Sequence, residues 1–100
     1  MTSSERKERF DALSRIGCIV CRVWHGVHTT PQIHHLTGLQ YRAMGKKAKD
    51  EDTCPLCVYH HTGGNPDILS VHGTPKLFRQ YYADQTELLR LTNEILEAAK

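Results

Sequence analysis

The sequence predicts a small α+β fold in which helices at both ends of the chain flank a central segment of short strands. Apolar residues recur at helical spacing near both termini, whereas residues 18–73 lack a long periodic segment and are rich in Cys, His, Gly and Thr. One hundred residues allow one domain, 1–100. It divides into an N-terminal helix (1–17), a central core (18–73) and C-terminal helices (74–100).

The two terminal segments carry recognisable helix signals. Residues 3–16 predict an amphipathic helix that Ser3 or Ser4 can cap and that Gly17 ends. Residues 75–99 are helical again, with Pro75 at the first helical position. Several further residues support this pattern: Phe10, Leu13 and Ile16 in the first helix, Thr74 as a cap, Asp84 with Glu87 as a capping box for a second segment, and an inward stripe of Leu88, Leu89, Leu91, Ile95 and Leu96.

The central segment is expected to be built from short strands. Residues 19–20 and 23–24 predict two strand pieces around a tight turn, and residues 32–36 predict another strand. No apolar run approaches the roughly 20 residues of a membrane span, so no membrane partner is expected. The charged N-terminus does not resemble a secretory signal, which predicts a cytoplasmic location.

Four cysteines and seven histidines are a large number of potential metal ligands for 100 residues. In a reducing compartment cysteines are more often metal ligands than disulfides, so a small disulfide-linked domain is disfavoured. A chain this short also buries a thin core and often needs additional stabilisation. Composition therefore favours metal binding, and a structural zinc ion is the strongest prediction that the residue spacing supports.

Cysteine spacing defines two alternative zinc sites. Cys18 and Cys21 form a CxxC pair, whose two intervening residues let both thiolates reach one tetrahedral ion. Cys54 with Cys57 would complete a four-cysteine site, whereas Cys57 with His60 would complete a site of three cysteines and one histidine. Both sets obey zinc stereochemistry, and spacing alone slightly favours four cysteines.

A histidine doublet marks a second constellation. On a strand the adjacent side chains of His34 and His35 face opposite ways, so one can bind a metal while the other points toward a substrate. A second ion could take His34, His61 and His72 and keep open positions, as catalytic sites do. His35 would then be a general base, because an ordinary imidazole titrates near neutrality.

Charge is distributed unevenly along the chain. The segment from Arg15 to Lys49, both included, contains six basic residues and no acidic residue, although the formal net charge of the chain is only +2. This asymmetry indicates a polyanionic partner such as nucleic acid, and a solvated basic loop is the alternative explanation. The residues expected to neutralise DNA phosphates are Arg42, Lys46, Lys47 and Lys49.

These motifs, taken in order, resemble the HNH nuclease motif. A CxxC pair precedes a His-His doublet on a short strand, and Leu-Cys-x-x-(Cys/His)-His follows. The resemblance is closest to phage recombination-enhancement (Ref-type), RecA-dependent nucleases, and it covers residues 18–89. The stretches that carry it are 18–21, 33–36, 55–63, 71–73 and 78–89.

The resemblance implies a ββα-metal core held by a treble-clef zinc, and it assigns the ligands. Cys18, Cys21, Cys57 and His60 are the implied ligands of the structural zinc. His34, His61 and His72 would bind the catalytic metal, which could be Mg, Mn, Ni or Zn, and Asn65 is the alternative third ligand. His35 takes the general-base position. Two residues depart from the motif. Asp52 occupies the central Asn position, which orients the base-bearing loop, and Cys54 has no counterpart.

The implied function is a metal-dependent DNA endonuclease that hydrolyses phosphodiester bonds during recombination or DNA processing in a bacterial host, encoded by phage or bacterium. A recombinase or another directing protein is the expected partner besides DNA. The alternative is a non-catalytic treble-clef zinc module that binds DNA or protein. That module needs only the structural zinc and the basic loop, and it leaves the other histidines unexplained.

Overall fold

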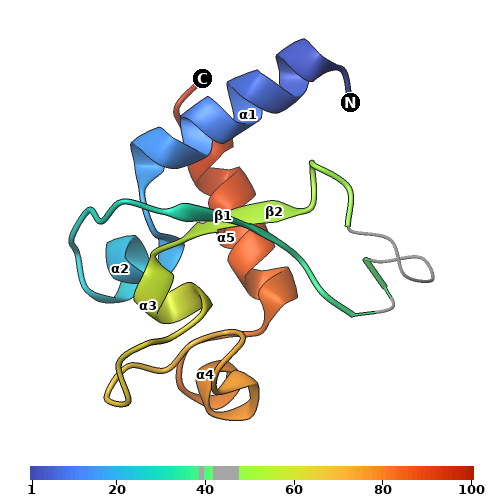
Figure 1. Cartoon of the computed structure of the whole chain (residues 1–100). Helices are drawn as coiled ribbons and strands as arrows, with labels where there is room; N and C mark the ends of the chain where they lie inside the picture. Colours follow the sequence, from blue (N-terminus) through green and yellow to red (C-terminus); the bar gives the residue numbers. More distant parts are fainter. Residues whose placement is uncertain (39, 42–47) are drawn as a thin grey trace.

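The computed structural model describes residues 1–38, 40–41 and 48–100 and confirms the α+β class (Figure 1). A two-stranded antiparallel sheet crosses the centre, α1 runs above it and α5 packs behind it. None of the helices in this described part combines the length and apolar character that a membrane span requires. The elements are α1 (Ser3–Ile16), α2 (Ile19–Trp24), β1 (Gln32–His35), β2 (Thr53–Leu56), α3 (Val58–His61), α4 (Pro75–Tyr81) and α5 (Gln85–Ala98).

The sheet places the histidine doublet at the centre of the domain. In the register of β1 and β2, His34 lies opposite Cys54 and His35 opposite Thr53. All four residues of β2 are buried, because α1, α2 and α5 all pack against this strand. A short strand buried on both faces shows no alternation of apolar and polar residues, which explains why β2 was not predicted.

Helix α1 spans the predicted residues 3–16, but its N-cap lies one residue before the predicted caps. Thr2, not Ser3 or Ser4, is the N-cap, and its hydroxyl accepts the backbone N–H of Glu5 while the Glu5 carboxylate accepts the Thr2 N–H. The reciprocal pair forms because Glu5 stands three residues after Thr2. Gly17 ends the helix as predicted, at a φ of 76° that favours glycine.

The prediction of strand pieces at residues 19–20 and 23–24 is wrong, because Ile19–Trp24 forms helix α2. Ile19 and Val20 favour strands intrinsically, but both are fully buried in the core, and tertiary packing overrides such a preference. The helical turn also brings Cys18 and Cys21, three residues apart, to the same side of the backbone.

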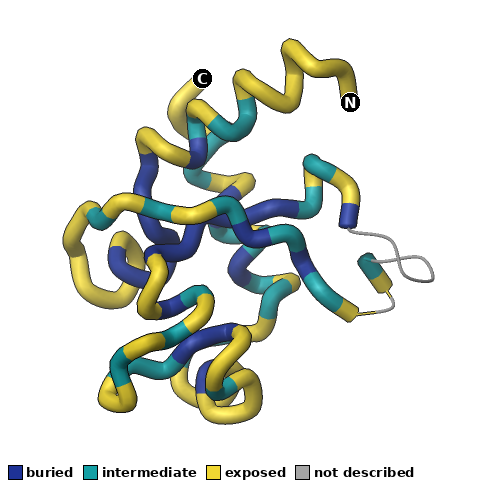
Figure 2. Tube along the Cα trace, viewed as in Figure 1, coloured by how far each residue is buried: buried dark blue, intermediate teal, exposed yellow. Residues whose placement is uncertain are grey.

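The C-terminal helical region consists of two helices joined at residues 82–84. The Asp84 carboxylate caps α5 by accepting the Glu87 N–H at 2.9 Å. Leu88 is fully buried, and three partly buried neighbours pack against the same core: Leu89, Leu91 and Ile95. The predicted inward stripe therefore anchors α5 behind the sheet, and Figure 2 shows the buried segments meeting there.

The core joins residues from every part of the chain. Fully or almost fully buried apolar side chains come from α1, α2, the residue directly after β1, strand β2, α4 and α5. They are Leu13, Ile19, Val20, Leu36, Leu56, Phe78 and Leu88. This core fixes the ends of α2, β1 and α3, where the candidate ligands lie.

Arg9 joins α1 to the sheet and to α5. Its guanidinium donates to the carbonyl and hydroxyl oxygens of buried Thr53 at 2.6 and 2.9 Å and to Asn93 Oδ1 at 3.1 Å. Replacing Arg9 with alanine is expected to lower the free energy of unfolding by about 1–3 kcal/mol, because the buried Thr53 oxygens lose their charged donor. Urea denaturation measures this change.

Lys7→Ala is the matched control for Arg9→Ala. Lys7 forms an exposed ion pair with Asp11 at 2.7 Å on the same helix, and such a pair contributes at most about 0.5 kcal/mol. Equal unfolding free energies for the two variants would show that the Arg9 contacts do not stabilise the domain.

Candidate metal centres

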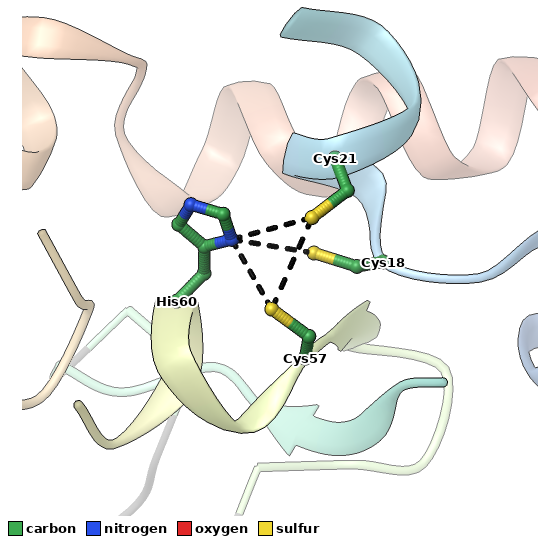
Figure 3. Close-up of side chains that lie close together, drawn as sticks. All are labelled: Cys18, Cys21, Cys57 and His60. Atoms are coloured by element: carbon green, nitrogen blue, oxygen red, sulfur yellow. Dashed lines mark hydrogen bonds between the residues drawn. The ribbon is translucent and has the colours of Figure 1, made fainter. Parts of the chain in front are cut away.

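The first candidate centre lies between the starts of two helices. Cys18 is the N-cap of α2 and Cys21 lies one turn further on. Cys57 is the N-cap of α3 and His60 lies one turn further on. Figure 3 shows the three sulfur atoms and His60 Nδ1 converging from the two helices. Each half therefore supplies two ligands from one helical turn.

The distances between these ligand atoms suit a shared tetrahedral ion. His60 Nδ1 lies 3.2, 3.6 and 3.8 Å from the sulfurs of Cys57, Cys21 and Cys18, and the Cys21 and Cys57 sulfurs are 4.0 Å apart. Zinc bond lengths of roughly 2.3 Å to sulfur and 2.0 Å to nitrogen place tetrahedral ligands about 3.5–3.8 Å apart. All four residues are buried, as in a closed structural site.

Burial controls the charge of this cluster. It raises the pKa of the Cys18 thiol to about 12 and also raises the pKa of the Cys21 thiol. Burial lowers the pKa of His60, so its imidazole stays neutral. A bound cation would stabilise the thiolates and release their protons.

The structure also separates the two alternatives for the fourth ligand. Among the described residues, His60 and not Cys54 joins Cys18, Cys21 and Cys57. Cys54 is a fully buried free thiol within β2, and burial raises its pKa to about 12. A protonated, enclosed thiol of this kind is chemically inert.

The second candidate centre consists of three histidines. Ligand nitrogens of His34, His61 and His72 all lie within 4.8 Å of one another. His61 Nε2 and His72 Nε2 are 3.2 Å apart, which suits two nitrogens of one ion. His34 is buried, His61 is half-buried and His72 is exposed. The cluster is therefore anchored on one side and open to solvent on the other.

Backbone pairing places His72 beside His61. The N–H groups of Val71 and His72 donate to the carbonyls of His60 and His61 at 2.8 and 3.0 Å. Asn65, the alternative ligand, instead uses its side-chain oxygen to accept the Asp67 N–H at 2.9 Å. The structure thus brings His72 to the cluster and keeps Asn65 in its own loop.

Burial favours the neutral form of His34 and His61, which is the form that metal binding requires. Burial, together with the smaller effects of the neighbouring His61 and His72, lowers the pKa of His34 to about 4. Burial also lowers the pKa of His61. Each of these two rings therefore keeps one unprotonated nitrogen that is available to a cation near neutral pH.

Two glutamines contact the rings of this cluster, and both were missed in the sequence. Gln32 Oε1 lies 2.8 Å from His61 Nδ1, and Gln85 Oε1 lies 2.8 Å from His34 Nε2. Gln32 precedes His34 by two residues on β1, so strand alternation could have indicated a shared face. Gln85 is 51 residues from His34, and no sequence signal links the two.

His35 faces a different environment from His34. Its Nε2 lies 3.1 Å from the Asp50 carboxylate, and its ring meets Phe10 of α1 edge-on at 6.2 Å. Asp52 was expected to orient this base, but the contacting carboxylate belongs to Asp50. Asp52 instead accepts the Leu36 N–H through its backbone carbonyl at 3.0 Å. Asp50 lies in the turn before β2, whereas Asp52 is the last residue before the strand and pairs through its backbone with Leu36 and Lys49.

The basic segment is described only in part. Lys49 is exposed beside this turn. Arg42, Lys46 and Lys47 lie outside the described residues.

The fold and the two clusters define a small α+β domain with one closed and one open candidate metal centre. A family model described as recombination enhancement, RecA-dependent nuclease matches residues 2–97, so the chain belongs to this family. The predicted closeness to recombination-enhancement, RecA-dependent nucleases is thereby confirmed, and family membership makes the chain a nuclease of recombination. No curated protein and no solved structure matches the chain.

Proposed function

We propose that this nuclease is a metal-dependent DNA endonuclease of the HNH type. The observation that carries the proposal is the open cluster of His34, His61 and His72 beside a separate closed cluster. Structural metal sites are closed, whereas catalytic sites keep positions for water or substrate. In this proposal β1, β2 and α3 form the ββα-metal core, and the closed cluster is its treble-clef zinc.

The donors of the open cluster fit a divalent cation. Three neutral imidazoles suit zinc, nickel or manganese better than magnesium on ligand softness, although phosphate and water could supply the oxygen ligands that magnesium prefers. A cation bound there supplies Lewis-acid stabilisation of the charge that develops on the scissile phosphate.

His35 is the proposed general base. Donation from its Nε2–H to Asp50 leaves Nδ1 as the nitrogen that takes a proton from the attacking water. The Asp50 carboxylate holds the ring and stabilises the imidazolium that forms, as a buried carboxylate does for other catalytic histidines. Thr53 helps to fix Asp50, because its hydroxyl donates to the Asp50 carbonyl at 2.8 Å.

Substrate binding is assigned to the basic segment. Arg42, Lys46, Lys47 and Lys49 would contact backbone phosphates, which makes affinity dependent on salt and largely independent of sequence. A recombinase is the proposed directing partner, in keeping with the RecA dependence in the family description. We place this activity in the cytoplasm of a bacterial cell.

Metal content and plasmid cleavage together test this proposal. The wild-type protein is expected to bind two metal ions per chain and to cleave plasmid DNA when a divalent cation and recombinase filaments are supplied. His72→Ala is expected to retain one ion and to lose cleavage, since it removes one ligand of the open cluster. Elemental analysis and gel electrophoresis measure the two outcomes.

Asn65→Ala is the matched control, because it removes the alternative third ligand. It is expected to keep two ions and full cleavage. A wild-type chain that binds one ion and cuts no DNA under these conditions would contradict the endonuclease proposal and favour the non-catalytic zinc module. If Asn65→Ala rather than His72→Ala loses the second ion, the ligand set is wrong.

A further inference from the structure

The side-chain amide of Gln85 links the start of α5 to the open histidine cluster. Its Oε1 lies 2.8 Å from His34 Nε2 and 2.9 Å from the backbone nitrogen of Thr37. Its Nε2 donates to Thr37 Oγ1 at 3.0 Å. Gln85 is the first residue of α5 and follows the Asp84 cap directly, so its position is set by a well-anchored helix end.

These contacts determine which nitrogen of His34 carries the proton. A backbone N–H only donates, so the Gln85 atom that faces Thr37 N–H is the amide oxygen and not the NH2 group. An amide oxygen only accepts, so His34 Nε2 is the protonated nitrogen. In a neutral imidazole Nδ1 then keeps the lone pair, which is the form that binds a cation.

We propose that Gln85 is a positioning residue that holds His34 in the Nε2–H tautomer and thereby presents Nδ1 to the cation shared with His61 and His72. This inference rests on the proposed function, because it concerns the same metal site. His34 is 1% exposed, so water does not compete for its Nε2–H. Gln85 acts through His34 and has no direct role in the chemical step.

The side chains that hydrogen-bond to the histidine rings are uncharged, and this affects how strongly the site attracts a phosphate. Metal-binding histidines often donate to carboxylates, which add negative charge around the ion. Here the contacts to His34 and His61 come from the neutral amides of Gln85 and Gln32. Neutral ligands with neutral orienting partners leave the full positive charge of the cation to attract an anionic phosphate.

Nickel titration of the zinc-loaded protein tests the positioning role. Isothermal titration calorimetry is expected to show Ni²⁺ binding at the open cluster weakened about 10–100-fold in Gln85→Leu, the usual effect of losing such an orienting partner. Gln85→Glu is expected to recover most of the affinity, because a carboxylate accepts from both His34 Nε2–H and Thr37 N–H. One zinc ion per chain in each variant shows that the closed cluster and the fold persist.

A direct readout of the tautomer accompanies the titration. Nitrogen-15 chemical shifts of His34, measured before nickel is added, are expected to report Nε2–H in the wild type and in Gln85→Glu, and a tautomer mixture in Gln85→Leu. Gln40→Leu is the matched control, because the Gln40 amide contacts Thr86 in the first turn of the same helix. It is expected to change neither measurement.

The His34→Ala variant distinguishes failure of the Gln85 positioning role from failure of the proposed metal site. If Gln85→Leu binds nickel like the wild type and keeps the His34 tautomer while His34→Ala loses nickel binding, Gln85 has no positioning role and the metal site stands. If His34→Ala also binds nickel like the wild type, the open cluster is not the metal site and the proposed function fails as well.

Discussion

DNA cleavage by the His35→Ala variant is expected to be about 10²–10⁴-fold slower than by the wild type, the usual contribution of a general base. His35 is poised for this role by Asp50, whose carboxylate lies 3.1 Å from its Nε2. His34, the adjacent residue, instead contacts Gln85 and the other two histidines of the open cluster. The loss should therefore appear in the cleavage rate and not in metal content. Single-turnover cleavage of labelled DNA, with elemental analysis of the same preparation, measures both quantities.

His28→Ala is the control for this prediction. His28 is an exposed histidine whose Nε2 donates to the Arg15 carbonyl at 3.1 Å, and it takes no part in either cluster. This variant is expected to cleave DNA at the wild-type rate. Wild-type cleavage by His35→Ala would remove His35 from the mechanism, whereas loss of the second metal ion in His35→Ala would assign it a ligand role instead.

Replacing Cys57 with alanine is expected to abolish folding of the domain as well as zinc binding. Cys57 supplies one of four buried ligands, and its sulfur lies 3.2 Å from His60 Nδ1. Structural zinc contributes roughly 10–16 kcal/mol of apparent binding free energy. A small domain has a net stability of only about 5–15 kcal/mol, so losing the ion removes most or all of it. Circular dichroism and zinc content measure the outcome.

Cys54→Ala makes the corresponding change at the other candidate ligand. Cys54 is fully buried in β2 and stands outside the cluster. Its replacement is expected to keep the zinc ion and to cost about 1 kcal/mol, the order of magnitude for one small buried group. Loss of zinc in Cys54→Ala, with zinc retained in Cys57→Ala, would contradict the ligand set that uses His60.

Comparison of Cys54 with His60 shows why spacing alone left the fourth ligand open. Residues 54–57 and residues 57–60 both offer ligands three positions apart. Cys54, however, lies in an extended strand whose register with His34 is fixed, and the backbone turns into α3 only after Cys57. Cys57 and His60 therefore share one helical turn and one side of the backbone. The choice depended on where β2 ends, which the sequence did not reveal.

The partners of the histidines show a second limit of the sequence. His35 was expected to be oriented by Asp52, and the structure gives the contact to Asp50, 15 residues away. Strand alternation correctly predicted that His34 and His35 face different surroundings. It could not predict what those surroundings contain, because they are supplied by a turn and by a helix from other parts of the chain.

The sequence by itself determined the α+β class, the helical ends of the chain, the family resemblance and the residue types of two candidate metal clusters. These properties follow from local periodicity and from ligand spacing within single turns of backbone. Tertiary structure alone decided that Cys18–Cys21 forms a helical turn, that Asp50 and not Asp52 contacts His35, and that Gln85 contacts His34. Such contacts join segments up to 51 residues apart, and only the packing of the shared core brings those segments together.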